Sequence, residues 1–135
     1  MKICGAREVV ILGHSMGGLL ARMLAEPDAL GDKVKVVISV GTPSLGSAIS
    51  RRGPGRNLRQ MRRGSAFLEQ LNARNQPKGL TNIGICSTHD AYVLPWHCAL
   101  SPVGDNFILR FRGHLTLLFS HEVLRIVGKT LDDKS

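Results

Sequence analysis

The sequence has few aromatic residues and no long apolar run, and both shortages exclude classes of protein. Of its 135 residues, 4% are aromatic and 43% are hydrophobic. No apolar run approaches the roughly 18–20 residues of a membrane-spanning helix, and the segment after Met1 does not resemble a signal peptide. We therefore expect a globular chain, cytoplasmic by default, and membrane-peripheral or secreted if an N-terminal part is missing.

Cysteine and histidine are present without the spacing of a metal site or a disulfide framework. The three cysteines, Cys4, Cys86 and Cys98, form no C-x-x-C pair, and the five histidines form no H-E-x-x-H motif. We therefore expect three free thiols, no metal and no other cofactor.

Acidic residues are missing from one long stretch of the chain. None occurs between Asp32 and Glu69. The same stretch holds six arginines within thirteen positions, at 51, 52, 56, 59, 62 and 63, in a chain of formal net charge +8. Such a balance permits anionic partners without establishing one.

Apolar periodicity predicts an alternation of strands and helices. Short, β-branched runs predict buried strands at 8–12, 34–40, 80–87 and 106–111. Apolar residues at helical spacing predict helices at 16–26, 65–74 and 121–131, the last two with Ser65 and Ser120 as N-caps. Residues 44–64 read as a long loop with short helical pieces. Together these elements predict an α/β fold with a parallel sheet of about four strands and flanking helices.

One motif carries chemistry. Gly13-His14-Ser15-Met16-Gly17 matches G-x-S-x-G, and it joins the first predicted strand to the first predicted helix, as a nucleophile elbow requires. The sharp turn lifts Ser15 Oγ out of the sheet and aims the Met16 N–H at the place where an oxyanion forms. We expect glycine at 13 and 17 because a larger side chain there would collide with the neighbouring strand and helix.

Longer segments around this motif resemble the lipase/esterase branch of the α/β-hydrolases, most closely triacylglycerol-lipase-like and GPI-inositol-deacylase-like sequences. The resemblance begins with VVILGHSMGGLLARML and VKVVISVGTPSLGS and continues through GRNLRQMRRGSAFLEQLN, ICSTHDAYVLP and GHLTLLFSHEVLRIV. It runs in the family's order from about Glu8 to Leu131. It implies hydrolysis of an ester or lipid substrate without a cofactor.

The resemblance also implies partners for Ser15. A serine hydroxyl needs a base, and the base needs an orienting acid. Asp90, after the third strand, resembles the family's acid, with Asp105 as the alternative. His114, after the fourth strand, resembles its base, with His121 as the alternative. His14 is expected to pack beside the site without being the base.

The sequence departs from the family at its front. Only residues 1–7 precede the first predicted strand, whereas in the family further strands and an H-G segment with the second oxyanion N–H come earlier. We therefore expect a single domain, 1–135, with a partial α/β-hydrolase fold that lacks the N-terminal strands, and we interpret the chain as a C-terminal fragment. Residues 9–12 would then form an exposed strand edge open to self-association, and a missing oxyanion donor costs about 10²–10³ in kcat.

The arginines from Arg51 to Arg63 fall in an insertion at about 44–78, where these lipases often carry a cap or lid. With Leu58 and Met61 they are suited to meet anionic lipid head groups. Phosphate-containing substrates and a merely solvated loop are the alternatives. Nucleic acid is not expected, since the run contains no aromatic residue and no reader motif.

Two functions from different classes remain. The first is a serine ester hydrolase with Ser15, Asp90 and His114 as its triad; acyltransferases and thioesterases share the same elbow. The second is a catalytically impaired α/β-hydrolase fragment that acts as a binding or interaction module.

Overall fold

Four parallel strands form one sheet in the order β1-β2-β3-β4. The structure is a computed structural model that describes residues 6–133. The strands are β1 (Val9–His14), β2 (Val34–Val40), β3 (Thr81–Ser87) and β4 (Asp105–Leu109). The helices are α1 (Met16–Leu24), α2 (Arg56–Gln60), α3 (Ala66–Ala73) and α4 (His121–Asp132). Short 3₁₀ segments are η1 (Gly31–Lys33), η2 (Ala48–Arg51), η3 (Trp96–Ala99) and η4 (Thr116–Phe119). The expected parallel α/β architecture is confirmed.

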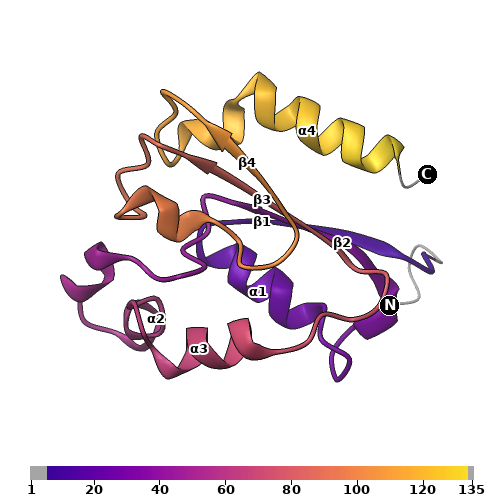
Figure 1. Cartoon of the computed structure of the whole chain (residues 1–135), viewed down its shortest axis with the longest axis horizontal. Coiled ribbons are helices and arrows are strands. Elements are labelled where there is room, and N and C mark those ends of the chain that lie inside the picture. The colour runs from indigo at the N-terminus through magenta and orange to yellow at the C-terminus, as the bar shows by residue number, and fades with distance from the viewer. Residues whose placement is uncertain (1–5, 134–135) are drawn as a thin grey trace.

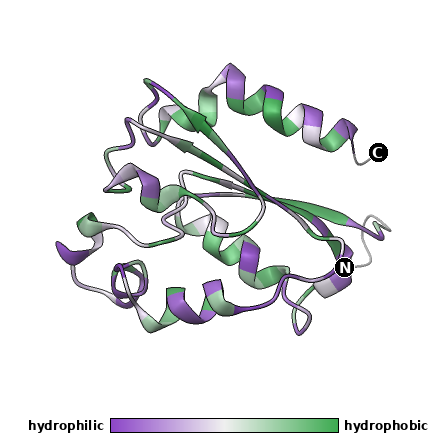
Figure 2. Ribbon diagram, viewed as in Figure 1, coloured by the Kyte–Doolittle hydropathy of each residue, from purple (hydrophilic) through white to green (hydrophobic). Residues whose placement is uncertain are grey.

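Helices cover the two faces of this sheet unequally (Figure 1). On one face α1 packs its alanines Ala21 and Ala25 against Val37 of β2. On the other face α4 and η4 cover the alternate residues of β2 and β3, and Val123 and Leu117 enter that core. Hydrophilic residues dominate the short α2, which lies away from the sheet (Figure 2). Alternation along β2 therefore explains why a nearly continuous apolar run is buried on both sides.

The segment between β2 and β3 is tied to α1 through α3. Ser65 caps α3 as expected, since its Oγ accepts a hydrogen bond from the Leu68 N–H at 3.3 Å. Leu68 and Leu71 then pack on Leu19 of α1. α3 is thus packed against α1.

A polar bridge reinforces this attachment. The buried Arg22 of α1 donates to Asn72 Oδ1 at 2.8 Å, and Asn72 Nδ2 donates to the Ser44 carbonyl at 2.9 Å. Three segments distant in sequence are therefore joined by one pair of side chains.

Several predicted boundaries need correction. The first strand runs to His14 rather than Leu12, because His14 still pairs with Val40 of β2. The first helix ends at Leu24 rather than Glu26. The fourth strand ends at Leu109 rather than Phe111, because the φ of Phe111 is 58° and therefore lies outside the extended region.

β1 lies at the edge of the described sheet, as expected. Val10 and Leu12 of β1 remain exposed on the face that α4 covers elsewhere. An unpaired apolar edge of this kind is a template for pairing with another strand. None of the helices within residues 6–133 combines the length and apolar character needed to cross a membrane.

Candidate active site

Ser15 sits in a strained turn between β1 and α1. Its backbone has φ 55° and ψ −127°, values that a residue with a side chain adopts only when its surroundings enforce them. The Ser15 N–H donates to the Val40 carbonyl at 2.9 Å, which ties the turn to the end of β2. At Gly13 a Cβ would lie 2.3 Å from the Gly17 carbonyl oxygen, so the expected need for glycine there is confirmed.

The same expectation is wrong for Gly17. A Cβ at Gly17 would meet nothing within 4 Å, whereas a Cβ at Gly18 would lie 2.0 Å from Thr42 Oγ1. One residue along a helix rotates the side chain by about 100°, so it is Gly18 that faces the loop after β2. Close packing of the elbow therefore depends on Gly13 and Gly18.

The first N–H of α1 is left unpaired at the elbow. Across residues 6–133 no backbone or side-chain acceptor takes a hydrogen bond from the Met16 N–H. The first N–H groups of a helix lack intrahelical partners and favour negative charge. This donor is therefore available beside Ser15.

Asp90 lies in the connection after β3 and is buried. Its Oδ1 accepts from the N–H groups of Tyr92 at 2.8 Å and Val93 at 3.0 Å, and its Oδ2 accepts from His114 Nδ1 at 2.7 Å. Burial alone raises the Asp90 pKa, but these three hydrogen bonds and the neighbouring imidazole outweigh it and lower the pKa. Asp90 is therefore held as a carboxylate that orients an imidazole.

His114, in the connection after β4, is held on several sides. Tyr92 stacks on its ring with centroids 5.0 Å apart, and the ring of His14 lies 4.5 Å away. His14 Nε2 donates to the His114 carbonyl at 3.0 Å, and burial lowers the His14 pKa. Behind the pair, a Cβ on Gly41 would come within 3.3 Å of both Asp90 Oδ2 and His114 Nδ1.

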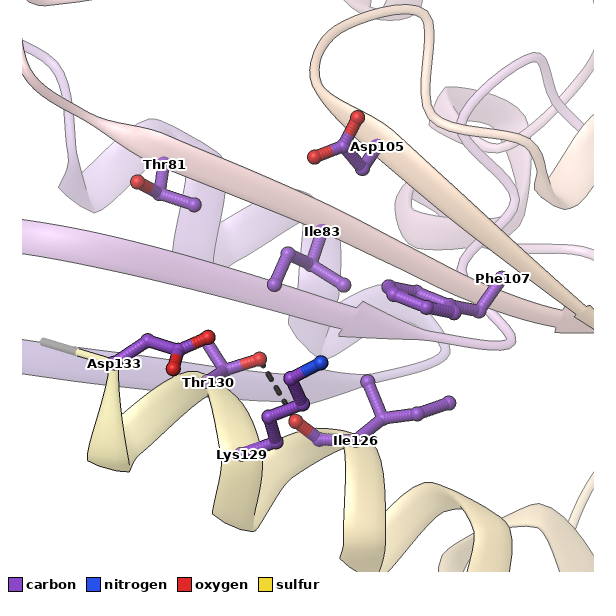
Figure 3. Close-up of a pocket in the computed structure, with 8 residues that line it drawn as sticks. All are labelled: Thr81, Ile83, Asp105, Phe107, Ile126, Lys129, Thr130 and Asp133. Carbon is purple, nitrogen blue, oxygen red and sulfur yellow. Dashed lines mark hydrogen bonds between the residues drawn. The ribbon is translucent and has the colours of Figure 1, made fainter.

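The alternatives to Asp90 and His114 lie away from the elbow. Asp105 begins β4 at the opposite edge of the sheet, where it lines a cavity of about 280 Å³ against the C-terminal part of α4 (Figure 3). His121 is exposed at the first position of α4. Neither side chain reaches the turn at Ser15.

A small cavity of about 90 Å³ opens at Ser15. Leu58 and Met61 from the α2 region, Ile49 from η2 and Tyr92 beside His114 contribute to its walls. Met61 also lines a second cavity of about 240 Å³ between α1 and α3. Within residues 6–133 no hydrogen bond joins Ser15 Oγ to His114; such bonds are often long in unliganded sites.

Two of the three cysteines lie within the described residues. Cys86 and Cys98 are free and buried, and Cys4 lies outside the described residues. Burial raises the pKa of the Cys86 thiol to about 11, which keeps it protonated at neutral pH. Residues 6–133 contain no group of three or more His, Cys, Asp or Glu side chains placed to hold a metal ion.

Residues 3–93 match the model of the PGAP1-like alpha/beta domain. The chain belongs to this family. No curated protein matches the chain.

Solved structures share the α/β-hydrolase fold at low identity. The lin2722 gene product of Listeria innocua is 16% identical over 92% of this chain, with a TM-score of 0.65. An alpha/beta superfamily hydrolase of Oenococcus oeni PSU-1 is 16% identical over 97% of the chain, with a TM-score of 0.62. The esterase domain of a Rhodothermus marinus protein is 20% identical over 90% of the chain, with a TM-score of 0.57.

The chain matches only part of these proteins. It spans 57% of the Listeria protein, 68% of the Oenococcus hydrolase and 58% of the Rhodothermus esterase domain. The four-stranded sheet is thus a partial α/β-hydrolase fold, as expected.

Sequence reasoning missed two residues that shape the site. Tyr92 follows Asp90 by two positions, and Gly41 follows β2 directly. Because Gly41 directly follows a predicted strand, its position in the sequence could have indicated that it lies near the site. Met61 was expected among the arginines of the insertion, but nothing in the sequence signalled that it lines two cavities.

Proposed function

We propose that the chain is a serine ester hydrolase of the lipase/esterase type, with Ser15, His114 and Asp90 as its catalytic triad. The observation that carries the proposal is the buried hydrogen bond of 2.7 Å between His114 Nδ1 and Asp90 Oδ2, at the sheet edge where the strained Ser15 turn lies. An acid and a base in this relation prepare an imidazole to take a proton from a serine hydroxyl.

The reaction uses these groups in two steps. Ser15 Oγ attacks the acyl carbonyl while His114 Nε2 takes its proton, and the N–H of Met16 stabilises the resulting oxyanion. The protonated His114 then gives its proton to the leaving alcohol. In the second step His114 takes a proton from water, which attacks the acyl carbonyl; the bond from the acyl carbon to Ser15 Oγ then breaks, and His114 returns the proton to Ser15 Oγ as the acid leaves. Asp90 stabilises the imidazolium whenever it forms.

The region around 44–78 acts as a cap over the acyl group in this proposal. Leu58, Met61 and Ile49 give the cavity at Ser15 an apolar wall. A cavity of about 90 Å³ favours a short acyl chain at this position.

An active-site probe tests the nucleophile directly. Incubation with a fluorophosphonate should label the wild type and leave Ser15→Ala unlabelled. Ser50→Ala is the matched control, because Ser50 lines the same cavity but its hydroxyl donates to the Ser47 carbonyl. Labelling of Ser15→Ala at the wild-type rate, or loss of labelling in Ser50→Ala alone, would contradict the assignment.

A second candidate is a non-catalytic interaction module. The observation that favours it is the apolar edge of β1, where Val10 and Leu12 are exposed beside unpaired backbone groups. A folded wild type that resists the probe and self-associates, with self-association abolished in Leu12→Lys, would favour this candidate.

A further inference from the structure

Several connections that follow the strands carry exposed apolar side chains. Phe111, Leu115 and Phe119, in the connection from β4 to α4, are 76%, 61% and 81% exposed. Leu45 after β2, and Tyr92 and Leu94 after β3, are exposed as well. The connections that carry them leave the carboxyl ends of the strands, at the left of Figure 1. An isolated exposed leucine needs no explanation, but such a group at one edge marks an interaction surface.

Positive charge borders the same edge. Five arginines of the segment 51–63 are exposed, at 51, 52, 56, 59 and 63. No acidic side chain within residues 6–133 forms an ion pair with any of them. Their charge is therefore uncompensated within the described chain and available to an anionic partner.

The cavity at Ser15 joins the two groups. Ile49 and Leu58, which belong to the arginine-bearing η2 and α2, line it together with Tyr92. Tyr92 in turn stacks on His114, the chain neighbour of the exposed Leu115. Tyr92 thus links the cavity to the exposed apolar group, and Ile49 and Leu58 link it to the arginine-bearing segment; we call the apolar group and the arginines together the rim.

We propose that the rim docks the protein on an anionic lipid surface, with the opening of the Ser15 cavity turned toward the lipid. Arginines attract phosphate head groups, while exposed phenylalanine and leucine side chains enter the boundary of the acyl chains. Apolar exposure favours lipid over a nucleic acid, whose phosphates offer nothing for Phe119 or Leu115 to enter. Docking itself does not require catalysis; its use in presenting esters to Ser15 rests on the proposed function.

Flotation with vesicles tests the docking. The wild type should bind vesicles of phosphatidylcholine mixed with phosphatidylglycerol and not phosphatidylcholine alone, and binding should weaken with salt. The combined variant Arg51→Gln, Arg52→Gln and Arg59→Gln should bind about 100-fold more weakly, at roughly fivefold for each arginine. Phe119→Ser should lower the binding that persists at high salt.

Matched controls come from the outer surface of α4. Arg125→Gln with Lys129→Gln removes exposed charges there, and Leu124→Ser removes an exposed apolar side chain. These variants should bind like the wild type. Ser15→Ala should also bind fully, which separates a failure of docking from a failure of the proposed hydrolysis.

Three results would overturn the docking proposal. The first is equal binding to neutral and anionic vesicles. The second is equal loss in the rim and α4 variants. The third is complete displacement by a short oligonucleotide with no effect of Phe119→Ser, which would assign the arginines to a soluble polyanion.

Discussion

Replacing Asp90 by asparagine keeps the shape of the side chain and changes what it offers to His114. The amide oxygen of the introduced side chain would still accept from the N–H groups of Tyr92 and Val93, because both bond to Oδ1 of Asp90. The amide NH₂ would then face His114 Nδ1, where a carboxylate oxygen now lies at 2.7 Å. Since an NH₂ group only donates, His114 would have to carry its proton on Nε2.

Two magnitudes follow from this exchange. A base protonated on Nε2 cannot take the Ser15 proton, and the equivalent change in a serine protease lowers kcat by about 10⁴. Exchanging a buried, charge-assisted hydrogen bond for a neutral one costs less than its complete loss, which is about 1.5–3 kcal/mol of unfolding free energy. Asp90→Asn should therefore lose nearly all ester hydrolysis while remaining folded.

Two measurements check this prediction. Hydrolysis of p-nitrophenyl butyrate gives kcat, and ¹⁵N NMR of the His114 ring reports the tautomer without requiring turnover. Asp105→Asn is the control, because Asp105 lies at the opposite edge of the sheet and should leave both readouts unchanged. An Asp90→Asn variant that keeps the wild-type tautomer, or an activity within tenfold of the wild type, would refute the reasoning.

The remaining predictions concern packing, cavity shape and pH. Gly13→Ala should lower the unfolding free energy by about 1–3 kcal/mol in urea titrations because its Cβ would meet the Gly17 backbone, whereas Gly17→Ala should be neutral or stabilising; equal losses would contradict the packing of the elbow. Met61→Ala should join the two cavities that Met61 lines. The kcat/KM for octanoate esters, divided by that for acetate esters, should then rise by about tenfold or more. An unchanged quotient would show that Met61 does not limit the length of the acyl chain. The unfolding free energy should fall as pH drops below 6.5, because the pKa of His14 is lowered in the folded chain and the unfolded chain therefore binds this proton first. It should fall again below pH 3.8, because the pKa of Asp90 is also lowered in the folded chain. His14→Gln should remove the first of these two losses of stability; if that loss persists in the variant, it comes from another group.

Local features of the site could be predicted because their causes are local. The Ser15 elbow depends on a strand, a tight turn and a helix that are contiguous in sequence, so the pattern around Gly13 was enough to locate it. Ser65 was predictable as a cap for the same reason. The choice of Asp90 over Asp105 needed the resemblance to a family. Both lie next to a strand, but Asp90 follows the end of β3 whereas Asp105 is the first residue of β4.

Particular contacts could not be predicted because they depend on the rotation and approach of separate elements. Glycine was expected to be essential at 17, but the helix turns that position toward open space and brings Gly18 against Thr42. The stacking of Tyr92 on His114 likewise depends on how two connections cross. No periodicity in the sequence encodes such an approach.

The sequence by itself determined the alternation of strands and helices, the serine turn and the uncompensated arginines, because periodicity, turn chemistry and charge are properties of neighbouring residues. Tertiary structure decided which carboxylate reaches His114, which glycine faces Thr42 and which residue lines both cavities, Met61. These outcomes depend on parallel strands that end at one edge and on helices packed at particular rotations, which bring together residues as far apart in sequence as His14 and His114.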